Sequence, residues 1–241
     1  KQKLDKVIKD IWILKCFLAV LSKKIIGIKS IKINNVAKLF MNLIYFEDKV
    51  IEHEILVHDY KRFVLNLEDI EDNFEKIYLQ FIKIFNQIMP ALEIYINMIE
   101  SDCSRMNRFL NCTQIIEYIS RRYDESNAEK IRCKYFEKTK NKKISLANRI
   151  ESLIEQTNYI WNLENEKIQK ISKRIANGRN YYNHHLKTIK PLSNDETYFV
   201  SYFLEDVILG YLYEKMDISR KIINLKLQDN IYYELDEIKK M

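Results

Sequence analysis

The sequence predicts a mainly α-helical protein with a small β-containing segment near its beginning. Only 3 Gly and 2 Pro occur among the 241 residues, too few to punctuate a many-stranded sandwich or barrel. Leu, Ile, Glu and Lys recur instead at intervals of three and four residues, which is the period of an amphipathic helix. A hydrophobic content of 47% with 12% aromatic residues allows a sizeable core and excludes a disordered chain.

The first 68 residues combine one predicted helix with short predicted strands. Apolar residues follow helical spacing over residues 3–21, whereas apolar and polar residues alternate over residues 28–45, and another strand is expected at 54–58. A sheet of two or three short strands is marginal by itself. The chain also begins at Lys1 without an initiator Met. We therefore expect residues 1–68 to be the end of an N-terminal domain that starts earlier.

Residues 69–241 are predicted to form a separate helical domain. Its first helix covers residues 69–89, and Pro90 is expected to kink or break it. A second apolar segment follows at 92–99. Residues 105–123 again repeat apolar positions at helical spacing and form the next expected helix.

A basic segment at residues 126–143 separates this helix from the next ones. The segment is only weakly amphipathic, so we expect a mobile arm or a short helix there. Ser145 can cap the helix that follows it. The next helix is expected to begin at Glu164 or Asn165.

The end of the chain contains the clearest helix-start signal. Pro191 stops the preceding helix, and Ser193 with Glu196 three residues later forms a capping box. The helix that follows, over residues 195–215, has a wide apolar face, so we expect it to be the central packing helix. Shorter helices are expected at 218–227 and 231–238.

Positive charge is concentrated in the middle of the chain. Residues 102–190 hold 19 Lys and Arg against 10 Asp and Glu, although the formal net charge of the whole protein is only +6. This distribution suits a polyanion such as RNA. The alternative is that part of it, residues 130–143, is simply a solvated linker or helix face.

The cysteines and apolar runs predict a cytoplasmic protein without a metal site or a membrane anchor. Cys16, Cys103, Cys112 and Cys133 show no CxxC pairing, so we expect reduced thiols and no zinc. His53 and His58 are expected to be surface histidines near a strand edge rather than metal ligands. The apolar run at residues 11–21 is interrupted by Lys15 and is too short to cross a bilayer.

The helical stretch at residues 167–190 carries polar side chains that packing does not require. A helical wheel gives a buried stripe made of Ile168, Ile171, Ile175, Gly178, Tyr182, Leu186 and Ile189. A continuous arc of about 140° holds four polar residues, Arg179, Asn180, Asn183 and His184. Tyr181 and His185 fall on the other flank. The arc is the predicted functional face of this helix.

Within that face, His184 is the better catalytic candidate of the two neighbouring histidines. Asn180 and His184 are four residues apart, so the amide of Asn180 can orient the imidazole. A second polar row, Gln114, Glu117 and Arg121, lies on the helix at 105–123. This row is either a solvent face or a partner of the Arg/His face, depending on how the two helices pack.

Arg and His on one helix face suit the cleavage of RNA. The ribose 2′-OH can attack the adjacent phosphate if a base takes its proton and an acid protonates the leaving 5′ oxygen. A histidine has a suitable pKa for proton transfer, and Arg binds phosphate in a bidentate manner. This chemistry needs no metal and no cofactor. One His serves both proton transfers poorly, whereas a symmetric dimer would bring two Arg and two His to one cleft.

The order Arg179-Asn180-x-x-x-His184 resembles the RNxxxH motif of nucleases in the HEPN superfamily. The sequence is similar to the ApeA-like HEPN proteins over a wider range, about residues 69–215. Arg108-Phe109-Leu110 with Gln114 and Glu117 resembles the helix that these proteins place before the motif. Residues 144–153, with Arg149, resemble their next helix.

The resemblance implies a HEPN-type helical bundle over residues 69–241 that dimerises through its motif helices. It implies an endoribonuclease of anti-phage or abortive-infection defence, acting on RNA, with tRNA as one candidate substrate. Arg179 and His184 would be the catalytic pair, Asn180 would orient the imidazole, and Glu117 would be a third member of the site. The residues expected to bind RNA are Asn183, Arg121 and Lys187. Residues 1–68 would be the end of a regulatory or sensing domain.

Two other interpretations of the motif remain. Arg179, Asn180 and His184 can form a helix cap or a polar network between helices. The domain can also be a catalytically silent HEPN-like module that serves as a dimerisation or nucleotide-binding partner for another protein. The presence of both Arg and His counts against a silent module, because such a module needs neither.

Overall fold

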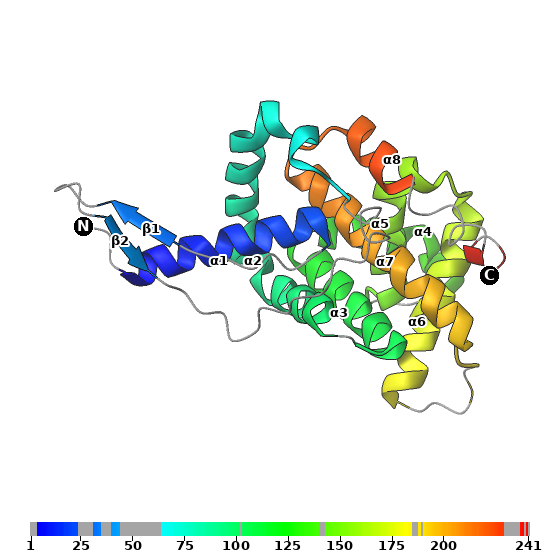
Figure 1. The fold of residues 1–241 in the computed structure, drawn as a ribbon. Helices are drawn as coiled ribbons and strands as arrows, with labels where there is room; N and C mark the ends of the chain where they lie inside the picture. The colour runs from blue at the N-terminus through cyan, green and yellow to red at the C-terminus, as the bar shows by residue number, and fades with distance from the viewer. Residues whose placement is uncertain are drawn as a thin grey trace. The chain divides into compact units, whose positions relative to one another are not determined.

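The computed structural model describes the following residues: 4–23, 31–34, 40–43, 64–101, 103–139, 143–184, 188, 190–228, 237–238 and 240. The chain divides into two compact units, Lys1–Phe63 and Val64–Met241, drawn in Figure 1. The division lies close to the predicted boundary at residue 68. The regulatory role expected for the N-terminal part stays a prediction.

The N-terminal unit contains one helix and two short strands among its described residues. Helix α1 is Leu4–Ser22, close to the predicted range. Strands β1 (Ile31–Asn34) and β2 (Phe40–Leu43) pair antiparallel, with Ile31 opposite Leu43. The strand expected at 54–58, together with His53 and His58, lies outside the described residues.

The second unit is helical, which confirms the predicted fold class. Two short 3₁₀ helices, η2 (Leu67–Asp69) and η3 (Glu71–Asn73), precede its first α-helix. The α-helices are α2 (Phe74–Glu100), α3 (Arg105–Tyr123), α4 (Glu125–Thr139), α5 (Leu146–Trp161), α6 (Asn165–His184), α7 (Asn194–Lys215) and α8 (Arg220–Gln228).

Helix α2 excludes one of the two outcomes expected at Pro90, a break in the helix. It continues through Pro90 to Glu100, so the helix is not broken there and the apolar segment at 92–99 belongs to it. A proline deprives the carbonyl four residues earlier of its hydrogen bond. Both Pro90 and Asn86 are exposed, so water can satisfy that carbonyl. Buried residues on both sides of Pro90, including Ile88 and Leu92, favour the continuous helix.

Helix α4 shows that the basic segment is partly a regular helix packed on its neighbours. Ala128 and Ile131 are buried, and α4 packs against α5. Two apolar residues one turn apart give a short helix an apolar face that can pack against a neighbour. Of the two predictions for this segment, a mobile arm or a short helix, the helix is therefore correct over residues 125–139.

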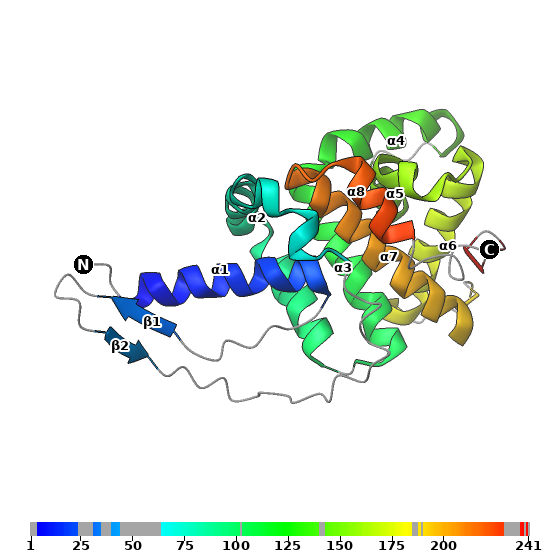
Figure 2. The same cartoon turned by 45° about the horizontal axis from the view of Figure 1, so that its top comes forward.

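Helix α7 is the central helix of the unit, as its wide apolar face predicted. It packs against α3 and α5, and Figures 1 and 2 show it lying beside both. The indole of Trp161 on α5 meets the ring of Phe203 edge-on, with 5.1 Å between ring centroids. Glu205, also on α7, is buried and accepts a 2.9 Å hydrogen bond from Arg108 of α3. The α3–α7 contact thus includes a partly buried ion pair.

Candidate active site on helix α6

Helix α6 presents its predicted buried stripe to the rest of the unit. Ile168, Ile171, Ile175 and Gly178 are buried, and Tyr182 is half-buried. The period of the helix therefore fixes which side of α6 faces outward. Leu186 and Ile189, the last two members of the predicted stripe, lie outside the described residues.

Gly178 allows the segment before α7 to approach the backbone of α6 closely. A Cβ atom at this position would lie 2.7 Å from Cγ and 2.8 Å from Cδ1 of Leu192. Leu192 is itself buried, so it has little room to move away. The glycine is needed here for space, directly before Arg179 of the motif.

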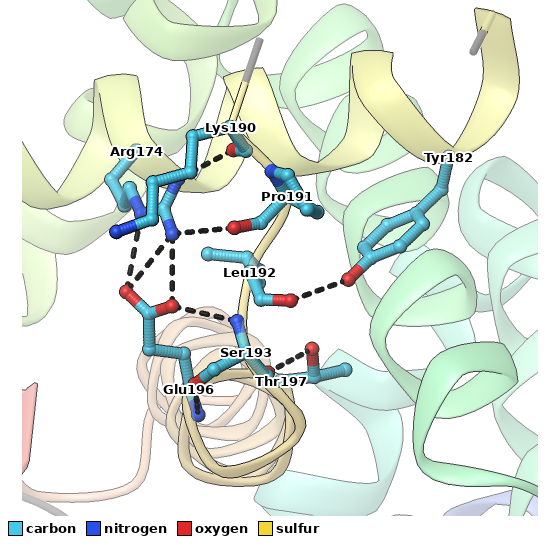
Figure 3. A network of polar contacts seen from close by, with 8 residues as sticks. All are labelled: Arg174, Tyr182, Lys190, Pro191, Leu192, Ser193, Glu196 and Thr197. Atoms are coloured by element: carbon cyan, nitrogen blue, oxygen red, sulfur yellow. Dashed lines mark hydrogen bonds and ion pairs between the residues drawn. The ribbon is translucent and has the colours of Figure 1, made fainter. Parts of the chain in front are cut away.

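Tyr182 stabilises the same contact, between α6 and Leu192, from the next turn of the helix. Its hydroxyl donates a 2.8 Å hydrogen bond to the carbonyl oxygen of Leu192, as Figure 3 shows. Its ring meets that of Phe109 on α3 edge-on, with centroids 6.0 Å apart. Gly178 and Tyr182 are thus packing residues, as predicted, and they set the position of Arg179 and Asn180, which lie between them.

Arg174 ties α6 to the start of α7 (Figure 3). Its guanidinium donates to the carbonyl oxygens of Lys190 and Pro191 at 2.7 and 2.8 Å, and to Oε2 of Glu196 at 2.8 Å. Glu196 also accepts from the backbone N–H of Ser193 at 2.7 Å and completes the predicted capping box. The sequence identified Glu196 as a cap, but Arg174 had no local signal because its partners lie beyond the end of its own helix.

Arg179 reaches a carboxylate on α3. Its Nη2 lies 3.4 Å from Oε2 of Glu117, and Arg121 donates to the other oxygen, Oε1, at 2.7 Å. The hydrogen bond to Glu117 raises the pKa of the Arg121 guanidinium above its ordinary value. Glu117 therefore lies between two arginines from two helices. The predicted polar row on α3 does pack beside the Arg/His face at this point, while Gln114 of the same row is exposed.

The other predicted site residues lie further along the outward side of α6. Asn180 is half-buried, and Asn183 and His184 are exposed. His184 is the last residue of the helix, five residues and about 140° from Arg179. His185 and Lys187 lie outside the described residues. Within one chain, Arg179 and His184 therefore share a helix end without facing each other directly.

Two features are absent from the described part of the chain. It contains no group of three or more His, Cys, Asp or Glu side chains placed to hold a metal ion. Its helices include none that is both long enough and apolar enough to cross a membrane.

A family model described as Apea-like HEPN matches residues 110–222. The matched range includes Glu117, Arg179 and His184 and extends from α3 into the first turn of α8. This part of the chain is an Apea-like HEPN domain. Comparison with curated protein sequences and with solved structures gives no match.

The HEPN match begins later in the sequence than the resemblance expected over residues 69–215. It starts within α3, so α2 lies outside it. It includes α7 completely and all of the Arg174–Glu196 network that positions the end of α6. The structural elements that hold the motif therefore belong to the matched domain.

Proposed function

We propose that this HEPN domain is a metal-independent endoribonuclease that acts as a homodimer, with tRNA as one candidate substrate and anti-phage defence as its setting. The observation that carries the proposal is the Arg179–Glu117 contact at the motif end of α6. A carboxylate beside a guanidinium fixes the direction in which its remaining N–H groups point. A phosphate bound by Arg179 would thus be held in a defined position.

The proposed reaction uses two proton transfers at one phosphodiester. A base removes the proton of the 2′-OH, and its oxygen attacks the neighbouring phosphorus while the bond to the 5′ oxygen breaks. An acid protonates that leaving oxygen, so the products are a 2′,3′-cyclic phosphate and a 5′-OH. His184 supplies the imidazole for these transfers, Asn180 orients it, and Arg179 stabilises the charge on the phosphate. Asn183, Arg121 and Lys187 contact the flanking RNA.

The test is RNA cleavage by the purified protein in EDTA, with sequencing that identifies the chemical ends. We expect 2′,3′-cyclic phosphate or 3′-phosphate ends and a loss of at least about 100-fold in the rate for Arg179→Ala and for His184→Ala. Arg122→Ala is the matched control, because Arg122 is an exposed arginine on α3 outside the proposed site. The sequence predicts that His185→Ala retains most of the activity.

Glu117 has a testable role as the residue that positions Arg179. We expect Glu117→Ala to lower kcat about tenfold while changing KM little, and Glu117→Gln to retain more activity because an amide oxygen can still accept from Arg179. Equal cleavage by the parent, Arg179→Ala and His184→Ala would refute the nuclease. Absence of cleavage by the parent on every RNA tested would favour the silent dimerisation module instead.

A further inference from the structure

The outward side of α6 carries a straight row of polar residues that begins far from the motif. Lys170, Lys173, Asn177, Asn180 and His184 follow each other at intervals of three and four residues, which keeps them within about 80° of arc. Asn180 is half-buried and the other four are exposed. We call these five residues the α6 track. Its last two members are proposed active-site residues, and the first two are lysines.

The charged residues of α6 that follow Glu166 are all positive. From residue 167 to His184 the helix contains no Asp or Glu, and five cations occur there, namely Lys167, Lys170, Lys173, Arg174 and Arg179. Glu166, one turn before Lys170, is the nearest acidic residue at the start of the row. Arg174 and Arg179 are paired with Glu196 and Glu117, so the three lysines supply the positive charge on successive turns that attracts an anion to the start of the row.

Helix α4 adds two residues beside the far end of the track. The ammonium group of Lys173 lies 5.9 Å from the ring centroid of Tyr135, and that of Lys134 lies 5.5 Å from it. The hydroxyl of Tyr135 donates a 2.7 Å hydrogen bond to the buried carboxyl group of Glu151. Burial, followed by this hydrogen bond, raises the pKa of Tyr135 to about 12, so the phenol stays neutral. The ring therefore attracts both lysines by cation–π interaction, and Lys134 also forms a 3.3 Å ion pair with Glu155 of α5.

We propose that the α6 track, with Lys134, binds the unpaired RNA strand that flanks the cleaved phosphodiester. This inference rests on the proposed nuclease function and assigns a substrate-binding path to it. Lys170 and Lys173 bind phosphates, Asn177 contacts the strand between them and the motif, and Asn180 and His184 lie at the cleavage point. The fourteen helical steps from Lys170 to His184 span about 21 Å along the helix, which leaves room for several nucleotides.

The width of the track favours one strand over a duplex. A double-stranded RNA is recognised through two backbones across a wide minor groove, which needs contacts in two separate rows. The α6 track is a single row, with the half-buried ring of Tyr135 beside its far end. An unpaired strand follows one row of cations with its backbone. The specificity expected from this geometry is for single-stranded or looped RNA.

Binding in the His184→Ala background, which prevents cleavage, tests the track. The full chain is titrated with a fluorescently labelled single-stranded RNA and with a hairpin-free duplex of the same sequence, at about 50 to about 200 mM salt. The test variant is Lys170→Gln/Lys173→Gln. The matched control is Lys83→Gln/Lys221→Gln, which removes the same charge from exposed positions on α2 and α8.

We expect the test variant to bind the single strand more weakly and with a shallower salt dependence, whereas the control binds as the parent does. Loss of two phosphate contacts lowers the slope of log Kd against log salt concentration by about 1.4. The ratio of the test variant's Kd to the parent's Kd should therefore fall about sevenfold from the lowest to the highest salt concentration. In the cleaving protein, the same two substitutions should raise KM and leave kcat nearly unchanged. Equal effects of test and control variants would overturn the track. Duplex binding as tight as single-strand binding would overturn the preference for an unpaired strand.

Failure of the track and failure of the nuclease give different results. If the parent cleaves RNA but the test variant keeps its KM and salt slope, the nuclease stands and the track is wrong. If the parent binds RNA through the two lysines without cutting it, the track stands and the nuclease is wrong. A parent that neither binds nor cuts single-stranded RNA would overturn both.

Discussion

At the scale of single residues, Gly178 decides how closely the motif helix and the following segment can approach. Ala is normally favoured over Gly inside a helix by about 1 kcal/mol. Here a Cβ atom would come within 2.7 Å of Leu192, and overpacking of this kind costs about 1 to 3 kcal/mol. The steric cost should exceed the gain in helix propensity, because Leu192 is buried.

We therefore expect Gly178→Ala to lower the free energy of unfolding, measured by urea titration. The double variant Gly178→Ala/Leu192→Ala should lose less free energy of unfolding than the sum of the losses in the two single variants. The reason is that Leu192→Ala removes the atoms that clash with the new Cβ. Additive losses, or a more stable Gly178→Ala protein, would show that Leu192 does not limit this position.

The same residues show what periodicity can and cannot predict. It placed Gly178 and Tyr182 on the buried side, because one side of a helix must face the core. It left open whether Glu117 meets Arg179, since these residues are 62 positions apart and their contact depends on how α3 and α6 pack. Periodicity alone does not distinguish the row from Lys170 to His184 from an ordinary solvent face, and its signal is instead the absence of acidic residues over 167–184.

At the scale of elements, the Arg174–Glu196 contact joins the end of one helix to the start of another. Burial raises the pKa of Glu196, but hydrogen bonds from Arg174 and from the backbone of Ser193 outweigh it, and the net pKa is below the ordinary value. A carboxyl group with a lowered folded-state pKa stabilises the fold above its unfolded pKa of about 4.3. This stabilisation is lost as the pH falls through the folded-state pKa.

Glu196→Gln tests this contact because glutamine keeps an oxygen for the capping box and loses the charge. We expect a loss of about 1 kcal/mol in the free energy of unfolding at pH 7, since both side chains are partly exposed. The difference from the parent should shrink below about pH 4. Asp195→Asn is the control, because it removes an exposed charge in the same helical turn. A difference that stays constant with pH would exclude the ion pair as its cause.

Element boundaries could be predicted where the signal is local. Ser145 and Ser193 each cap a helix as expected, because a cap depends on residues three positions apart. Pro90 allowed either a kink or a break, and the helix continues through it because tertiary packing on both sides outweighs the one hydrogen bond that proline removes. The basic segment allowed two predictions for a related reason, since its weak amphipathicity gives little sign of packing, whereas Ala128 and Ile131 of α4 are buried.

At the scale of the whole molecule, composition predicted the helical class, and the charge excess of residues 102–190 indicated where an anion would bind. Composition carries no information on assembly, because the surfaces that meet in a dimer are set by three-dimensional shape. The dimer is instead inferred from chemistry. One chain offers one Arg179 and one His184, about 140° apart on α6, whereas the reaction needs both an acid and a base.

A shared site predicts that an inactive protomer silences an active one. After subunit exchange with an about ninefold excess of His184→Ala protein, about nine tenths of parent protomers would be in mixed dimers, and each mixed dimer has one imidazole for two proton transfers. We expect cleavage per parent protomer to fall to about a tenth. The same mixture assayed before exchange is the control, and capture through a tag on the parent measures the exchange. Unchanged activity after exchange, or a fully active monomer in solution, would show that each chain carries a complete site.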